Sequence, residues 1–247
     1  MIFLGIFMLF AGNAHAAAPD ASALVRREEN HIFGKSLRAK VTMLVDPDGI
    51  SRTLEFRFWS RGFDRSLIKI LKPVKDLNLG NLKLGKQFWQ FLPKVDQVII
   101  VPQSMMLQSW MGSDFTNDDL VKASRLSVDY SLKLTGEAEV SGKKVYVVEA
   151  IPKPGAVVVW GKIVEYLSQS DSVFVKRELY DDKKVLVKTL TGADWKTFNG
   201  HTIATTLTMT NHAENGRRTI MKYADVVFDE ELPDSTFTQQ RLRRPVY

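Results

Sequence analysis

Apolar and polar residues alternate with a period of two along most of the chain, as in strands that bury one face. In the segment SVDYSLKL, Val128, Tyr130, Leu132 and Leu134 share one face, and polar residues take the other. The same alternation occurs in LRAKVTMLV, TLEFRF, SVFVKRELY, HTIATTLTMT and TIMKYADVVF. The pattern predicts about ten β-strands and a mainly β protein.

Turn-forming residues separate the expected strands. Asp46, Pro47, Asp48 and Gly49 lie between LRAKVTMLV and TLEFRF and predict a hairpin loop. The segments YDDKK, TFNGH and AENGRR are similar connectors. Successive hairpins make neighbouring strands antiparallel. Because such a sheet must bury one face and protect its edges, we expect it to curl, to pair with a second sheet or to be covered by helices.

Three segments carry helical signals, and the sheet should therefore dominate the fold. The first is ASALVRREENHIF, residues 21–33, and the second runs from Asp234 to about Arg243, after Pro233. The third is MMLQSWMGSDFTNDDL, residues 105–120, in which methionine and tryptophan are crowded. Methionine fills irregular apolar space and is common at surfaces that accept varied shapes.

The third segment has residues typical of helix ends at the positions expected for a short helix. Pro102 suits the first helical turn, and Gly112 suits the position just past a helix end. A helix here would gather four apolar residues within an arc of about 140°, so this face is expected to meet something apolar. The four residues are Met106, Leu107, Trp110 and Met111.

A second short helix is expected to follow. Thr116 and Asp119 are spaced as in a capping box, which marks a helix start. Gly112, Ser113 and Asp114 would then form the elbow between the two helices, since glycine permits a sharp turn. This arrangement would let the capped helix move as a small unit.

The first residues resemble an export signal. The apolar run from Ile2 to Ala11 is too short to span a bilayer, and the following Ala14-His15-Ala16 fits a signal cleavage site. No Lys or Arg precedes the run, which is unusual for a signal, and a buried N-terminal helix is the alternative. We expect residues 1–17 to be a removed signal peptide and residues 18–247 to form a single domain.

The composition narrows the compartment and the partners. The chain has no cysteine, which excludes disulfides, thiolate metal sites and the lipid attachment point of a lipoprotein. The mature protein is therefore expected to be soluble in the periplasm and not lipid-anchored. The formal net charge of +6 favours contact with anionic membrane surfaces over nucleic acid.

The sequence shows no constellation for catalysis or for a cofactor. The histidines of the expected mature chain are scattered, without metal-ligand spacing: His31, His201 and His212. Ser113 is not in a nucleophile-elbow motif, and no phosphate loop or dinucleotide fingerprint is present. Asp114, Asp118 and Asp119 could supply paired carboxylates for sugar chemistry, but helix capping is the favoured interpretation.

Bulky apolar side chains are the most distinctive feature of the chain. They gather in FRFW, in FWQFLP and in residues 105–115. Together they would supply wide, adaptable walls for a pocket that holds acyl chains. The candidate cavity residues are Met43, Phe56, Phe58, Trp89, Phe91, Met106, Leu107, Trp110, Met111 and Phe115.

Residues 71–120 resemble the LolA-like, outer-membrane lipoprotein-sorting protein family. The resemblance rests on the Trp89-x-Phe91-x-Pro93 strand and on Met-Gly-Ser-Asp-Phe followed by Asp-Leu. It continues through YVVEAIPKP, VKRELYDDKKVLVKTL and FDEELPDSTFTQQRL, so it covers most of the mature chain. The similarity is to the broad uncharacterised branch of the family rather than to LolA itself.

The resemblance implies a strongly curved antiparallel sheet that forms an unclosed β-barrel, with short helices covering its concave face. Lipid or lipoprotein acyl chains would bind between the sheet and the helices. The segment Met105–Leu120 would then be a lid, with its methionines facing the acyl space. Carriers of this family hold the lid shut with polar residues, for which Arg57 and Arg61 are the candidates here.

The expected function is that of a monomeric, non-catalytic periplasmic carrier. It would take its cargo from an inner-membrane transporter of the ABC or RND type and deliver it to an outer-membrane acceptor, without a cofactor and without nucleic acid. Two alternatives stay open. One is an exported β-fold hydrolase that acts on an envelope glycan or lipid, with Asp114 or Asp119 in its site, and the other is a non-catalytic envelope scaffold.

Overall fold

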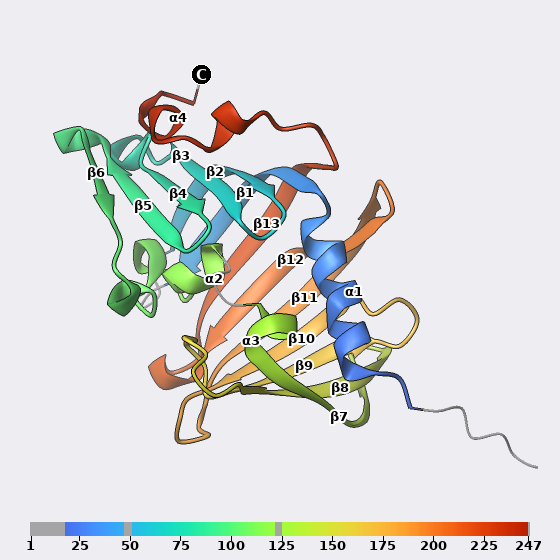
Figure 1. Cartoon of the computed structure of the whole chain (residues 1–247). Helices are drawn as coiled ribbons and strands as arrows, with labels where there is room; N and C mark the ends of the chain where they lie inside the picture. The colour runs from blue at the N-terminus through green and yellow to red at the C-terminus, as the bar shows by residue number, and fades with distance from the viewer. Residues whose placement is uncertain (1–17, 47–50, 122–124, 247) are drawn as a thin grey trace, which may run out of the picture.

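A computed structural model describes residues 18–46, 51–121 and 125–246 (Figure 1). The expected signal peptide and most of the loop predicted at 46–49 lie outside the described residues. Thirteen strands form one antiparallel sheet, which confirms the mainly β prediction, although about ten strands were expected. The first six strands are β1 (Ser36–Asp46), β2 (Arg52–Arg61), β3 (Arg65–Lys72), β4 (Gly80–Leu84), β5 (Gln87–Leu92) and β6 (Gln97–Ile100). The remaining seven are β7 (Tyr130–Val140), β8 (Lys143–Pro152), β9 (Lys162–Ser168), β10 (Phe174–Tyr180), β11 (Leu186–Phe198), β12 (His201–Asn211) and β13 (Arg217–Phe228).

The order of the strands leaves the sheet open. It runs from β6 down to β1, then β13, and then down to β7, so β1 and β13 pair in the middle and β6 and β7 are the two edges. The sheet curves without joining these edges, as expected of an unclosed barrel (Figure 1). Residues 101–129, called the crossing segment below, connect one edge to the other.

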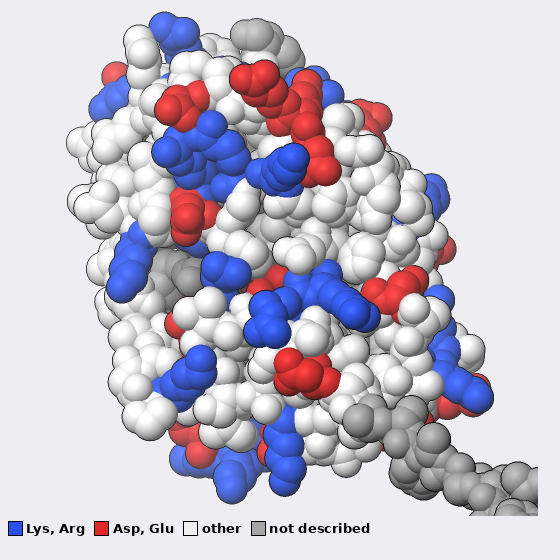
Figure 2. Space-filling view, turned by 45° about the vertical axis from the view of Figure 1, so that its right-hand side comes forward, with Lys and Arg blue, Asp and Glu red and all other residues white. Residues whose placement is uncertain are grey.

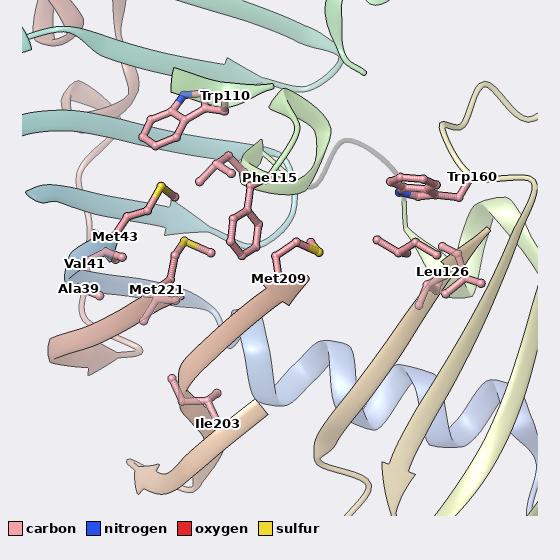
Figure 3. Packing of buried hydrophobic residues seen from close by; sticks show 14 of the residues in the cluster. Ala39, Val41, Met43, Trp110, Phe115, Leu126, Trp160, Ile203, Met209 and Met221 are labelled. Atoms are coloured by element: carbon pink, nitrogen blue, oxygen red, sulfur yellow. The ribbon is translucent and has the colours of Figure 1, made fainter. Parts of the chain in front are cut away.

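Strand β1 illustrates how the alternation of the sequence becomes a core. Leu37, Ala39, Val41, Met43 and Val45 are all buried, and they share one face because side chains alternate along a strand. The neighbouring strand β2 adds its own apolar residues to this face. These side chains belong to the main hydrophobic cluster, which lies between the concave face and the helices. Figure 3 shows Phe115 of the crossing segment pointing toward Met209 and Met221 of this cluster.

Helix α1 (Ala21–Phe33) is formed as predicted and covers the concave side (Figure 1). Asp20 caps it, because its carboxylate accepts hydrogen bonds from the backbone N–H groups of Ser22 and Ala23. The helix contacts β7, β9 and β12 and buries Leu24 and Val25 in the main cluster. It therefore lies across the hollow of the sheet.

The short α-helix expected before Gly112 is not formed. The crossing segment contains two 3-10 turns, η3 (Gln103–Met105) and η4 (Trp110–Gly112), followed by the short helices α2 (Asn117–Val121) and α3 (Leu126–Asp129). Met111 has a left-handed backbone with φ of 52°, which interrupts any regular helix. The chain instead folds back on itself, with the N–H of Trp110 donating to the carbonyl of Phe115 over 2.8 Å.

The convex face of β2 to β5 is covered by the C-terminal segment. Here η6 (Asp234–Phe237) and α4 (Gln239–Arg243) form in the region predicted to be helical. They pack against a second apolar cluster that forms a cross-strand row. The row consists of Trp59, Leu67, Leu82 and Trp89. Lys69 on the same face is fully buried; burial lowers its pKa to about 8, and its ammonium group donates to the carbonyl of Leu242 over 2.6 Å.

Candidate functional site

A cavity of about 160 Å³ lies between the concave face, α1 and the crossing segment. Its walls include Phe58, Leu190, Leu207 and Tyr223, apolar or aromatic side chains that point inward and yet are only partly buried. Burial nevertheless raises the pKa of Tyr223 to about 12, as expected for a phenol in poorly polar surroundings. Inward-facing apolar groups that are not fully packed are the feature that sets this site apart from an ordinary core.

The cavity is small compared with typical ligand-binding pockets. Pockets that hold drug-sized ligands are typically about 300–1,000 Å³. A cavity of about 160 Å³ is closer to the space that holds a benzene-sized group. The space between the sheet and the helices over it is therefore limited in this structure.

Four of the ten predicted cavity residues are buried in the main cluster on the concave face, and Phe58 packs against it. Phe56, Phe58 and Phe115 line the cavity. Met43 and Trp110 are fully buried in the same cluster but do not form its walls. Phe56 and Trp110 meet edge to face, with ring centroids 5.3 Å apart.

The other predicted cavity residues are dispersed. Trp89 and Phe91 lie on the opposite face of the sheet, under the C-terminal segment. Met106 packs in a small separate cluster at β5, and Met111 is partly buried beside the main cluster. Leu107 is 57% exposed. The apolar arc expected for a helix is thus split among different surroundings.

Asp114 at the elbow is buried and is held by strands of the sheet rather than serving as a helix cap. One carboxylate oxygen lies 2.8 Å from Nε of Arg217, and the other accepts a hydrogen bond from the hydroxyl of Thr219 over 2.7 Å. Asn211 donates to the same carboxylate, and Lys188 donates to the carbonyl of Asp114. The crossing segment is therefore anchored to β11, β12 and β13 at this point.

The expected capping box is present at Thr116. The backbone N–H of Thr116 donates to the carboxylate of Asp119 over 2.8 Å, and the N–H of Asp119 donates to the hydroxyl of Thr116 over 3.1 Å. Gly112, with φ of +71°, occupies a backbone conformation that favours glycine. The hydroxyl of Ser113 is buried and donates to the carbonyl of Trp110 over 2.7 Å, so it is engaged in local structure.

The two latch candidates lie away from the crossing segment. Arg57 is exposed and, by strand alternation, shares the convex face with Trp59. Arg61 donates to the carbonyl of Leu232 over 3.2 Å and pairs with Asp234. Arg61 therefore holds the C-terminal segment to the sheet.

Polar contacts that the sequence did not predict join α1 to its surroundings. Arg177 of β10 lines the cavity, binds both carboxylate oxygens of Glu165 and lies 3.5 Å from Glu28 of α1. Burial alone would lower the pKa of Arg177, but the neighbouring carboxylates outweigh burial and raise it. Glu29 of α1 accepts hydrogen bonds from the N–H and the hydroxyl of Ser127. The consecutive Glu28 and Glu29, on a helix that must bury one face, were the available signal.

The surface charge is mixed. Figure 2 shows clusters of Lys and Arg side chains with Asp and Glu side chains beside them. On this face the described residues form no uninterrupted basic stripe of the kind that follows a nucleic acid backbone. Among residues 18–46, 51–121 and 125–246, no group of three metal-binding side chains converges. In the same ranges, no helix has the length and apolar character needed to span a bilayer.

Comparisons with known proteins agree with this architecture. A family model described as an uncharacterized protein matches residues 62–244. No curated protein sequence matches the chain. A crystal structure of a DUF1329 family protein from Desulfovibrio piger is 23% identical, has a TM-score of 0.83, and covers 90% of this chain and 97% of its own.

Two further crystal structures have the same fold. A domain from Vibrio parahaemolyticus, described as a putative outer membrane lipoprotein-sorting protein domain, is 24% identical with a TM-score of 0.82, and covers 91% of this chain and 98% of its own. A LolA superfamily protein from Nitrosomonas europaea is 22% identical with a TM-score of 0.78, and covers 91% of this chain and 100% of its own. The chain therefore belongs to the family of uncharacterized proteins that the matching model describes, and its fold is that of the LolA-like, outer-membrane lipoprotein-sorting proteins.

Proposed function

We propose that this protein is a non-catalytic carrier that encloses the acyl chains of a lipid or a lipoprotein in the concave cavity. The observation that carries the proposal is the set of partly exposed apolar side chains that face inward from the unclosed sheet, such as Phe58, Leu207 and Tyr223. Apolar surface is normally removed from water in a core, so leaving it accessible inside a hollow favours a ligand-binding role.

The two parts of the cover are held in different ways. The crossing segment is anchored through the buried Asp114, whereas α1 is held by its apolar face, by Glu28 and Glu29, and by His31, which accepts a hydrogen bond from the N–H of Thr202. Moving a helix exposes apolar area, and an equilibrium between closed and open states responds to a ligand that binds one of them better. We therefore place the opening movement at α1 and keep the Asp114 region fixed.

The envelope setting is part of the proposal. The signal-like N-terminus and the basic composition support a periplasmic carrier that meets anionic membranes. An inner-membrane transporter of the ABC or RND type would be the donor, and an outer-membrane component the acceptor. Cross-linking in intact cells, followed by identification of the linked membrane protein, tests this assignment.

Filling the cavity should weaken binding of an acyl probe. Leu207→Trp places a large ring into the hollow, so the affinity for the methyl ester of dansylundecanoic acid is expected to fall by about tenfold or more. The measurement is a fluorescence titration of purified, delipidated protein. Thr208→Trp is the matched control, because the neighbouring side chain points away from the cavity, and it should change affinity less than about twofold. Equal effects of both variants would contradict the carrier proposal.

Loosening α1 should speed ligand entry. Glu28→Gln removes the carboxylate that faces Arg177 while keeping its size, so the open state becomes more populated. We expect the association rate of the same probe to rise about threefold to tenfold in stopped-flow fluorescence. Arg26→Ala is the control on the exposed side of α1, where the pair with Asp20 is worth little. An unchanged rate in Glu28→Gln would show that α1 is not the moving part.

A further inference from the structure

The cavity changes character toward the turn between β2 and β3. Phe56 and Phe58 of β2 are followed on the same face by Ser60, and Ser60 pairs across the strands with Ser66 of β3. Both serines line the cavity, and Ser66 pairs in turn with Lys83 of β4. The wall therefore carries a row of polar side chains here, in addition to charged side chains elsewhere such as Glu28, Asp118 and Arg177.

Ser60 is the informative member of this row. It is 1% exposed, and its hydroxyl has no hydrogen-bond partner within the described part of the chain. Buried polar groups are normally paired, because leaving one unsatisfied costs about 1–3 kcal/mol. A buried hydroxyl in the wall of a ligand cavity points to a hydrogen bond that the ligand completes.

The charges around this corner are compensated. The ammonium group of Lys83 donates to the carbonyl of Phe63 over 2.6 Å. Burial lowers the pKa of Lys83, and the nearby carboxylates of Asp64 and Asp118 oppose that shift. The guanidinium of Arg65 is paired with Asp234. A phosphate or a free carboxylate would therefore have to displace an existing partner, whereas a neutral oxygen meets the hydroxyl directly.

We infer that the cavity takes a neutral amphiphile, with its uncharged hydroxyl or ester oxygen at Ser60 and its chain directed toward Leu207 and Tyr223. This inference rests on the proposed carrier function and adds the class and the orientation of its cargo. Glycerides, long-chain alcohols and ester-linked acyl groups share the required chemistry. An acyl chain that ends in a free acid does not.

The test compares ligands that share one chain and differ at its end. Oleyl alcohol, oleate and octadecene compete with the bound methyl ester of dansylundecanoic acid, a neutral probe, each below the concentration at which it aggregates. In the unmodified protein, oleyl alcohol is expected to bind about fivefold or more tightly than either competitor, as for one added hydrogen bond. In Ser60→Ala this preference should disappear, while binding of octadecene stays the same.

The stability of the empty variant distinguishes a ligand-binding serine from a structural one. Because the hydroxyl has no partner in the chain, Ser60→Ala should keep or raise the melting temperature. Thr202→Val is the control, since this residue also lines the cavity but its hydroxyl already pairs with Thr197 at 2.9 Å, and the preference should persist there. Equal or tighter binding of oleate, or an unchanged preference in Ser60→Ala, would contradict the inference about the cargo but not the proposed carrier function. If no probe binds the unmodified protein, the carrier function itself is contradicted.

Discussion

Replacing Asp114 with asparagine is expected to lower the free energy of unfolding by about 3 kcal/mol. The carboxylate is fully buried and receives hydrogen bonds from Arg217, Thr219 and Asn211, so an amide would place a donor among donors. The loss stays at the lower end of the range for buried pairs because Arg217 keeps its contact with Glu214 at 2.6 Å. Urea unfolding followed by tryptophan fluorescence measures the change.

Asp119→Asn is the control for this prediction. Asp119 closes a capping box on a short helix, and losing such a contact costs about 0.5–2 kcal/mol. If Asp114→Asn cost no more than Asp119→Asn, the carboxylate of Asp114 would be acting as an ordinary local contact. The crossing segment would then lack the fixed point assigned to it above.

Trp110→Ala is expected to destabilise the protein by about 3–5 kcal/mol, as for truncation of a large side chain in a packed core. Trp110 is 1% exposed, packs against Phe56 and donates from its indole nitrogen to Asn81 over 3.0 Å. Because it does not form a cavity wall, the affinity for the methyl ester of dansylundecanoic acid per folded molecule should stay unchanged. Thermal unfolding and a probe titration on the same preparation measure both quantities.

Leu107→Ala provides the matched control from the same segment. Its side chain is 57% exposed, so the change in stability should stay within about 0.5 kcal/mol. The opposite pattern for Trp110→Ala, with weaker probe binding and nearly unchanged stability, would contradict the placement of this side chain. The tryptophan would then face the ligand rather than support the core.

The sheet was predictable where a strand buries one face only. In β1 the alternation of Leu37 to Val45 is visible in the sequence because one side is core and the other is not. The short strand β4 could not be predicted from such an alternation. Its residues Gly80 to Lys83 are all buried, since the crossing segment covers one face and α4 the other, and burial on both faces erases the period of two.

The site was less predictable because it depends on partners that are remote in sequence. Pro102 and Gly112 are placed as residues at the two ends of a helix would be. The backbone N–H of Trp110, however, donates to the carbonyl of Phe115 in a folded-back loop. Glu28 meets Arg177, and Asp114 meets Arg217, only after strands from different parts of the chain have come together. Local spacing carries no information about such pairs.

The place where β1 meets β13 also has a consequence for how the chain folds. Every other pair in the sheet joins strands that are neighbours in sequence, so β1 to β6 and β7 to β13 are two meanders of local contacts. Contacts between residues close in sequence form quickly, whereas joining distant ones requires costly loop closure. The pairing of Val41 with Tyr223 belongs to the second kind and unites the two meanders. Until β13 is available, β1 has an unpaired edge, so the first half of a newly made chain must stay protected from association with other strands.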